Sequence, residues 1–175
     1  MSIAEIISVI NKMETGGIIR RYAIGGAVGA TFYLEPVATV DVDIFISFRL
    51  QPGQSLISLK SIHDYLARFG CTVEGEYVLI AGWPVQFLPV SDALSEEALA
   101  EAMTVNVEGI PARVFTAEHL AAIALQTGRA KDKARLLQFV EERAVEPMRF
   151  EAILARHGLI GRWREFQKTY SGKQP

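Results

Sequence analysis

The sequence predicts an α+β protein with α/β-like alternation at its start: a mixed β-sheet followed by a helical C-terminal region. Three observations lead to this fold class. Segments with helical and strand-like spacing alternate as far as about residue 70, short strands then follow one another through tight turns up to residue 115, and the remainder is helical in pattern. Because strands joined by tight turns pair antiparallel, the sheet is not expected to be doubly wound.

The first elements are predicted from capping residues and hydrophobic spacing. Ser2 and Glu5 form a capping box ahead of isoleucines at helical spacing, which predicts a helix that ends near Met13. The next expected elements are a short strand over 21–24, a buried helix over 27–34, and a strand over 40–48 that ends at a Gln-Pro-Gly turn, 51–53.

The middle of the chain is expected to begin with a helix and continue as hairpins. A helix over 58–69 carries four large apolar residues on one face, and Gly70 supplies its C-terminal glycine. Ser95-Glu96-Glu97 is expected to begin a further short helix. Strands are predicted over 72–74, 77–81, 85–90, 105–107 and 110–115, with turns at 75–76, 82–84 and 108–109.

The C-terminal region is predicted to be entirely helical after Thr116, a good N-cap residue. Helices are expected near 117–127, 131–143, 147–157 and 159–169, separated by Gly128, Pro147 and Gly158. We expect residues 1–115 to form one domain, residues 116–170 to pack on it, and residues 171–175 to be a frayed tail.

Composition and charge exclude several classes of protein. With 175 residues, 50% hydrophobic and 22% charged, the chain is neither disordered, collagen-like nor a coiled coil, and a lone cysteine, Cys71, excludes a disulfide scaffold. No apolar run is long enough to cross a membrane, so a cytoplasmic protein is expected.

Residues 1–111 carry a net charge of -7 and residues 112–175 carry a net charge of +5. The two parts can serve a metal and a polyanion, or can simply attract each other.

The segment 22–47 is the most informative part of the chain for function. Gly25-Gly26 ends a strand and opens a helix, and Asp41 and Asp43 begin the next strand shortly after Thr39. Paired glycines let a backbone approach an anion, and residues two apart on a strand point the same way. Two carboxylates on one face, together with a substrate phosphate, are the oxygen ligands that Mg²⁺ prefers.

Two other interpretations fit the residues of this segment less well. A dinucleotide-binding G-x-G-x-x-G fails, because its first glycine would fall on Ile24. A D-x-D pair in an exposed loop is usually only solvated, but here it opens an apolar strand behind a Gly-Gly turn. The histidines and Cys71 show no zinc-ligand spacing.

On these residues the sequence resembles the nucleotidyltransferase superfamily that shares its fold with DNA polymerase β. The closest likeness is to small bacterial AbiEii-type and related nucleotidyltransferase-like proteins, some of which are toxins of toxin–antitoxin pairs. The family pattern of a Gly-Gly turn, a Ser/Thr and D-x-D matches Gly25-Gly26, Thr39, Asp41 and Asp43. A later Lys-Asp pair of many relatives resembles Lys131-Asp132, and the likeness covers about residues 18–142.

The resemblance implies Mg²⁺-dependent, or Mn²⁺-dependent, transfer of a nucleoside monophosphate from an NTP to an acceptor hydroxyl. The acceptor is an RNA such as tRNA, a protein or a small molecule, and a partner protein of a toxin–antitoxin pair is a further expectation. The implied roles are catalysis and metal binding by Asp41 and Asp43, and nucleotide binding by Gly25, Gly26, Thr39, Lys131, Arg129 and Arg135. The alternative for the three basic residues is a solvated helix face above a core.

The sequence departs from the family pattern at two places. Active relatives carry a third acidic residue on a later strand, whereas the matching position here is Gln86, which neither acts as a base nor binds Mg²⁺ well. Glu74 or Glu76 on the preceding hairpin is a candidate substitute. Val37-Ala38 stands where many relatives carry an arginine. A catalytically lapsed relative that binds nucleotide or a partner protein is therefore the second hypothesis, and an unrelated nucleotide-binding module the third.

Overall fold

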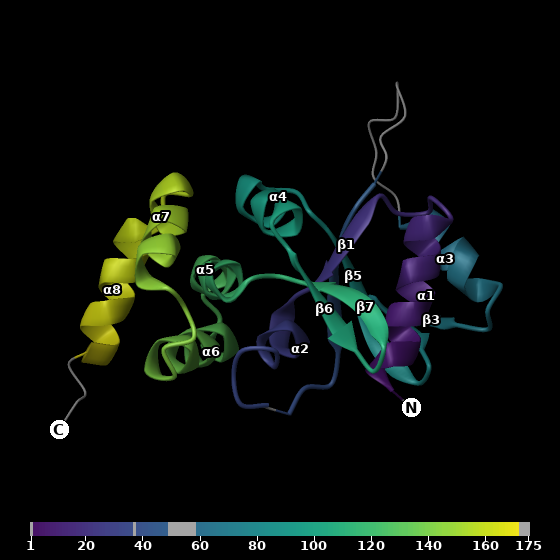
Figure 1. Ribbon diagram of the computed structural model, residues 1–175, viewed down its shortest axis with the longest axis horizontal. Coiled ribbons are helices and arrows are strands. Elements are labelled where there is room, and N and C mark those ends of the chain that lie inside the picture. The colour runs from purple at the N-terminus through teal and green to yellow at the C-terminus, as the bar shows by residue number, and fades with distance from the viewer. Residues whose placement is uncertain (1, 37, 49–58, 172–175) are drawn as a thin grey trace.

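The computed structural model describes residues 2–36, 38–48 and 59–171 (Figure 1). The Gln-Pro-Gly turn at 51–53, the start of the helix predicted from residue 58, Val37 and the tail after residue 171 lie outside the described residues. The elements are α1 (Ile3–Thr15), β1 (Arg21–Ile24), α2 (Gly26–Ala30), β2 (Val42–Ser47), α3 (Lys60–Ala67), β3 (Thr72–Glu74), β4 (Tyr77–Ile80), β5 (Trp83–Pro89), α4 (Ala93–Ala100), β6 (Met103–Val107), β7 (Ile110–Val114), α5 (Ala117–Thr127), α6 (Ala130–Glu141), α7 (Pro147–Arg156) and α8 (Ile160–Ser171).

Within the described residues, the strands form one seven-stranded sheet in the order β3-β4-β5-β2-β1-β7-β6. The pairs β2/β5 and β1/β7 are parallel, and the other neighbouring strands are antiparallel. This confirms the predicted mixed sheet, in which the strands after residue 72 pair through short turns. The two parallel pairings join strands from distant parts of the sequence, and they place β1 and β2 at the centre of the sheet.

Helices cover both faces of the sheet (Figure 1). Helices α1 and α3 pack on one face, and α2, α4 and α5 lie on the other, with α6 to α8 outside them. Alternation along β2 separates the two cores: Val42, Ile44 and Ile46 are buried against α1 and α3, whereas Phe45 packs on Phe115 with ring centroids 4.7 Å apart. Asp43 therefore points to the same face of the sheet as Phe45.

Capping residues begin α1 and α5, and end α5, where the sequence predicts. Ser2 and Glu5 form the expected capping box of α1, and the Thr116 hydroxyl accepts from the backbone N–H of His119 at 3.4 Å. Gly128 ends α5 at φ +69, a left-handed conformation that favours glycine. These local signals account for the close match between predicted and observed helix positions in the C-terminal region.

Several element boundaries differ from the predictions, and local hydrogen bonds or backbone angles explain three of them. Helix α3 ends at Ala67 rather than at residue 69, and β6 begins at Met103 rather than at residue 105. Helix α2 is shorter than the predicted 27–34, because the Phe32 and Tyr33 N–H groups donate to carbonyls three residues back. The predicted turn over 82–84 is instead Ala81-Gly82, both at positive φ, so β5 already begins at Trp83. Helix α4 begins at Ala93, ahead of Ser95, because Asp92 accepts from the Ser95 N–H at 2.9 Å. The strand predicted over 40–48 begins only at Val42.

The C-terminal helices are tied to α4 by a cluster of ionisable side chains around Glu97. Its carboxylate accepts from Arg156 at 2.6 Å, from His157 at 2.9 Å and from His119 at 3.3 Å. His119 is fully buried, and burial lowers its pKa, so the ring is neutral near pH 7. Its Nε2–H then donates to Glu97 while Nδ1 accepts from the Thr116 hydroxyl at 2.8 Å.

This cluster predicts a loss of stability on acidification. Folding lowers the pKa of His119, so the contribution of the neutral ring to the stability of the fold is present above pH 6.5 and declines as the pH falls below that value. The hydrogen bond from Arg156, together with those from both histidines, lowers the pKa of Glu97 to about 2. The ionised carboxylate therefore contributes about 2–3 kcal/mol to the free energy of unfolding above pH 4.5, and this contribution is lost as the pH falls towards 2.

The measurement is the free energy of unfolding in urea across this pH range. Glu97→Gln is expected to reduce stability at neutral pH and to flatten the dependence between pH 4.5 and 2, because the titrating carboxylate is gone. Glu96→Gln, one residue earlier and exposed, is the matched control and is expected to keep the wild-type profile. A wild-type profile in the Glu97→Gln protein would contradict the assignment.

Among the described residues, no helix is both long enough and apolar enough to cross a bilayer. The division into a domain over 1–115 and a helical region over 116–170 stays a prediction. One hydrophobic cluster joins buried residues of α2 and α4 to those of α5–α8, so the two parts share a core.

Candidate active site

The Gly-Gly turn and the aspartates meet because β1 and β2 are antiparallel neighbours. Ile24 pairs with Ile44, and the Gly25 N–H donates to the Asp43 carbonyl at 2.9 Å. The end of β1 therefore lies beside the beginning of β2. Because the Gly25 N–H is already used in this bond, the Gly26 N–H is the one of the pair that remains for a phosphate, and that contact stays a prediction.

Both glycines are required by the side chains that lie against them. A Cβ at Gly26 would stand 1.8 Å from the Asp43 Oδ2, and Gly26 has φ +57. A Cβ at Gly25 would stand 2.5 Å from Phe45 Cε2. The carboxylate of Asp43 thus occupies the space that a side chain at position 26 would need, so this turn and this aspartate form one unit.

Asp43 is the most strongly perturbed carboxylate of the site. It is mostly buried, and this burial, together with the neighbouring charge of Asp41, raises the pKa of Asp43. Three cations act in the opposite direction: Lys131, Arg135 and Arg129. The structure therefore brings the three basic residues of the sequence prediction into electrostatic range of Asp43, from the beginning of α6, almost ninety positions later in the chain.

Asp41 lies just before β2, although the sequence suggested a strand position for both aspartates. It is held by two hydroxyl groups: Thr39 Oγ1 is 3.2 Å from Asp41 Oδ1, and Tyr77 Oη is 3.5 Å from Asp41 Oδ2. Thr39 Oγ1 is equally close to the Asp41 carbonyl. Thr39 thus contacts Asp41 directly, and the phosphate contact implied for it remains a prediction.

Tyr77 is a site residue that the sequence analysis missed. Desolvation of its phenol and the nearby carboxylates of Glu76 and Asp41 raise the pKa of Tyr77, so the group keeps its proton and donates. Its sequence position, at the beginning of an ordinary hairpin strand, carries no signal for such a role. Only the pairing of β4 with β5 and of β5 with β2 brings it to Asp41.

Asp132 is the second functional residue that received no role from the sequence. Its side chain is 3% exposed, and it accepts from Arg129 Nε at 2.6 Å while Arg135 Nη1 lies 3.7 Å away. Arg129 is 61% exposed and remains open to a ligand. Among the described residues Lys131 has no ion-pair partner, and it is exposed. Asp132 thus orients two arginines and leaves the lysine free, while Leu136 of the same helix is in the core.

Gln86 lies directly beside Asp43, as the comparison with the family pattern predicts. The two residues are paired in register on the parallel strands β2 and β5. Gln86 Nε2 donates to Glu76 Oε2 at 2.9 Å, so Glu76, rather than Glu74, is the carboxylate drawn towards this position. Within the described part of the chain, no three or more acidic, histidine or cysteine side chains are grouped closely enough to hold a metal. Among residues 2–36, 38–48 and 59–171, the aspartates therefore form a pair without a third carboxylate grouped with them.

Comparison with known proteins gives structural likenesses only. No protein-family model matches the chain, and no curated protein matches it in sequence. An antigenic nucleotidyltransferase-like protein from Paracoccidioides brasiliensis has a similar structure, with a TM-score of 0.55, 12% identity, and coverage of 96% of this chain and 91% of that one.

The antibiotic-resistance factor ANT(2'')-Ia is similar in two structures. Its solution structure gives a TM-score of 0.50 and 16% identity over 95% of this chain and 97% of that one. Its crystal structure with adenylyl-2''-tobramycin gives a TM-score of 0.50 and 16% identity over 90% of this chain and 98% of that one. At these identities the likenesses show the fold: the chain has the mixed-sheet architecture of nucleotidyltransferase-like proteins.

Proposed function

We propose that this protein is a nucleotidyltransferase that moves a nucleoside monophosphate from an NTP to an acceptor hydroxyl. One observation carries the proposal: Asp43 lies against the Gly25-Gly26 turn, with the charge of Asp41 and the basic side chains at the start of α6 in electrostatic range. In this proposal, anionic metal ligands and cationic phosphate ligands share one site. The fold of the nucleotidyltransferase-like proteins supports the same activity.

The donor set at the aspartates fits a divalent cation. A buried carboxylate with a raised pKa beside a second carboxylate is stabilised by a cation, and two protein carboxylates with substrate phosphates are a usual Mg²⁺ environment. We assign Asp41 and Asp43 as ligands of Mg²⁺ or Mn²⁺. When bound, the metal supplies charge neutralisation at the transferring phosphate.

The chain's own residues account for the remaining requirements. Lys131 and Arg129 neutralise the triphosphate, and Asp132 keeps Arg129 and Arg135 oriented. The acceptor oxygen bonds to the α-phosphorus as the bond to pyrophosphate breaks, and the acceptor proton must pass to a base. Gln86 cannot accept it, so we assign this role to Glu76, whose carboxylate accepts a hydrogen bond from the Gln86 amide on β5.

We test this assignment with a prediction for Glu76→Gln. Removing the base is expected to lower kcat by about 10²-fold, while the KM for NTP changes little. Glu74→Gln is the matched control, because it removes an exposed carboxylate two residues away on the same hairpin. Equal effects of the two substitutions, or none from Glu76→Gln, would rule out Glu76.

The acceptor is proposed as a class rather than a single molecule. The crystal structure of ANT(2'')-Ia contains adenylyl-2''-tobramycin, which supports including aminoglycosides among the acceptors tested. The net charge of +5 over residues 112–175 supports an RNA such as tRNA, and the AbiEii-like pattern supports a role in a toxin–antitoxin pair with a partner protein. The lone cysteine suits activity in the reducing cytoplasm.

The decisive experiment measures transfer of label from each α-labelled NTP. The protein is incubated with Mg²⁺ or Mn²⁺ and with total tRNA, cell lysate or aminoglycosides, beside an Asp41→Ala/Asp43→Ala variant. Label transfer and pyrophosphate release that vanish in the variant are the expected result. Equal labelling by both proteins would show that the aspartates are not the site.

A catalytically lapsed protein is the second candidate, and Gln86 is the observation that favours it. For a lapsed protein, we expect NTP to bind without release of pyrophosphate under any of these conditions. Measurement of NTP binding by calorimetry on the same samples separates the two candidates, because only the enzyme converts bound NTP.

A further inference from the structure

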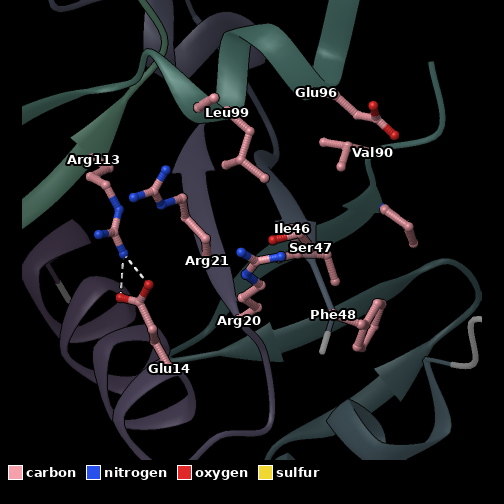
Figure 2. A pocket seen from close by; sticks show the side chains of 12 residues that line it. Glu14, Arg20, Arg21, Ile46, Ser47, Phe48, Val90, Glu96, Leu99 and Arg113 are labelled. Carbon is pink, nitrogen blue, oxygen red and sulfur yellow. Dashed lines mark hydrogen bonds and ion pairs between the residues drawn. The ribbon is translucent and has the colours of Figure 1, made fainter. Parts of the chain in front are cut away.

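A cavity among the described residues, seen from close by in Figure 2, lies at the opposite end of β1 and β2 from the aspartates. It has a volume of about 960 Å³ and is bounded by the first residues of β1, the last residues of β2 and β5, and one side of α4. We call it the arginine cavity, after Arg20, Arg21 and Arg113 in its wall. No residue assigned to nucleotidyl transfer lines it.

The three arginines differ in how they are paired. Arg113 is bound to Glu14 through Nη2, donates from Nε to the Tyr22 carbonyl at 3.1 Å, and lies over the Tyr22 ring at 5.2 Å. Its charge is therefore neutralised and its position fixed. Among the described residues, the guanidinium groups of Arg20 and Arg21 have no hydrogen-bond or ion-pair partner, and both are exposed.

The backbone beneath the two unpaired arginines is rigid. The Arg20 N–H donates to the Ser47 carbonyl at 2.8 Å, and Arg21 pairs in register with Ser47 across β1 and β2. Figure 2 shows Arg20 and Arg21 between Arg113 and the end of β2. Two like charges are thus carried by adjacent residues of a fixed backbone, an arrangement that a bound anion stabilises.

The rest of the cavity is apolar on the sheet and helix sides. Ile46 and Leu99 are buried, and Phe48 and Val90 border the same space. Glu96 is the remaining acidic residue of the lining, and it lies on α4, beside Val90 in Figure 2. A ligand that satisfies both parts of the lining carries a strong negative charge at one end and an apolar body at the other.

We propose that the arginine cavity binds a small phosphate monoester whose organic part is apolar or aromatic. A phosphate monoester carries a charge of about -1.5 to -2 at pH 7, which matches the two unpaired guanidinium groups. Its oxygens accept the paired N–H donors that each guanidinium presents. A body of aromatic size fills the apolar part of the cavity against Leu99 and Phe48.

This site is separate from the site of nucleotidyl transfer. β1 runs from Arg21 at the cavity to Ile24, which precedes the Gly-Gly turn, and β2 runs from Asp43 back to Ser47. Four strand residues span about 13 Å, too far for one phosphate to contact both ends. The ligand is therefore an effector or a second substrate component, and it is not the NTP phosphate bound at the aspartates.

Calorimetric titration with phenyl phosphate, in a buffer with EDTA, tests the proposal. Phenyl phosphate is expected to bind with a millimolar dissociation constant and more tightly than inorganic phosphate or phenol, which each provide half of the recognition. Arg20→Gln/Arg21→Gln is expected to weaken binding about tenfold or more, and Arg20→Lys/Arg21→Lys by less, because lysine keeps the charge without the paired donors.

Three controls make the result specific to this cavity. Arg68→Gln/Arg164→Gln removes two exposed arginines elsewhere and is expected to bind normally, as is Asp43→Asn. Backbone amide shifts in NMR spectra are expected at Arg21 and Ser47 and not at Gly26. Absence of binding, equal weakening in the Arg68/Arg164 variant, or shifts confined to Gly25 and Gly26 would each overturn the proposal, whether or not the protein transfers nucleotides.

Discussion

Asp43→Asn is expected to abolish nucleotidyl transfer while leaving the protein at least as stable as the wild type. Asparagine has nearly the shape of aspartate, so it fits against Gly26 without a new clash. It removes one of the two anionic ligands assigned to the metal, and loss of about 4 kcal/mol of transition-state stabilisation corresponds to a rate lower by about 10³-fold. The measurement is label transfer under single-turnover conditions.

The expected gain in stability follows from the direction of the pKa shift. Burial and Asp41 raise the pKa of Asp43, so the ionised form is less favourable in the folded protein than in the unfolded chain. Its stabilising contribution is complete below the unfolded pKa and is lost as the pH rises through the folded value. At neutral pH, removal of this charge therefore leaves the melting temperature unchanged or higher.

Metal binding gives a readout that does not depend on activity. A divalent ion that binds the folded protein raises its stability by mass action, so Mg²⁺ or Mn²⁺ is expected to raise the melting temperature of the wild type. Asp43→Asn should lose most of this effect. Asp64→Asn, on the exposed side of α3, should keep it and should transfer label normally. Wild-type transfer by Asp43→Asn would refute the metal assignment.

Gly26→Ala is expected to reduce transfer by about 10²-fold or more and to destabilise the fold. The new Cβ would lie 1.8 Å from the Asp43 Oδ2, so the carboxylate must move, and a displacement of about 1 Å in a catalytic group is sufficient for such a loss. Residue 26 also has φ +57, which costs an L-residue about 1–2 kcal/mol.

Gly70→Ala separates these two effects. Gly70 has φ +76 with no atom within 4 Å of an added Cβ, so the substitution brings the backbone strain without the contact with Asp43. Urea unfolding is expected to show a comparable strain cost in both proteins and a further cost in Gly26→Ala alone, and only Gly26→Ala should lose activity. If both variants transfer label at the wild-type rate, Gly26 does not position Asp43.

The fold was predictable wherever its signals are local. The Ser2 capping box, the Thr116 cap and Gly128 set helix ends through contacts within a few residues, and the structure confirms each of them. The boundaries that differ depend on choices that composition does not reveal. Asp92 and Ser95 are both good caps, and only the folded chain shows that Asp92 is used.

The candidate site was predictable in part for a similar reason. Gly26, Asp41 and Asp43 occur in one short segment, and their spacing on neighbouring strands brings them together. Tyr77 and Asp132 reach the site through long-range strand pairing and through the packing of α6, for which the sequence has no local signal. The choice of Glu76 over Glu74 likewise depends on which side of the hairpin faces Gln86.

The register of Gln86 against Asp43 also has an evolutionary consequence. Every glutamine codon differs from a glutamate codon at its first base alone, so a point mutation in the gene would place a carboxylate directly beside Asp43. Such a mutation would also break the bond to Glu76 and set three acidic groups near one another. A lineage could therefore retain that change only where divalent metal is bound strongly enough to offset the repulsion.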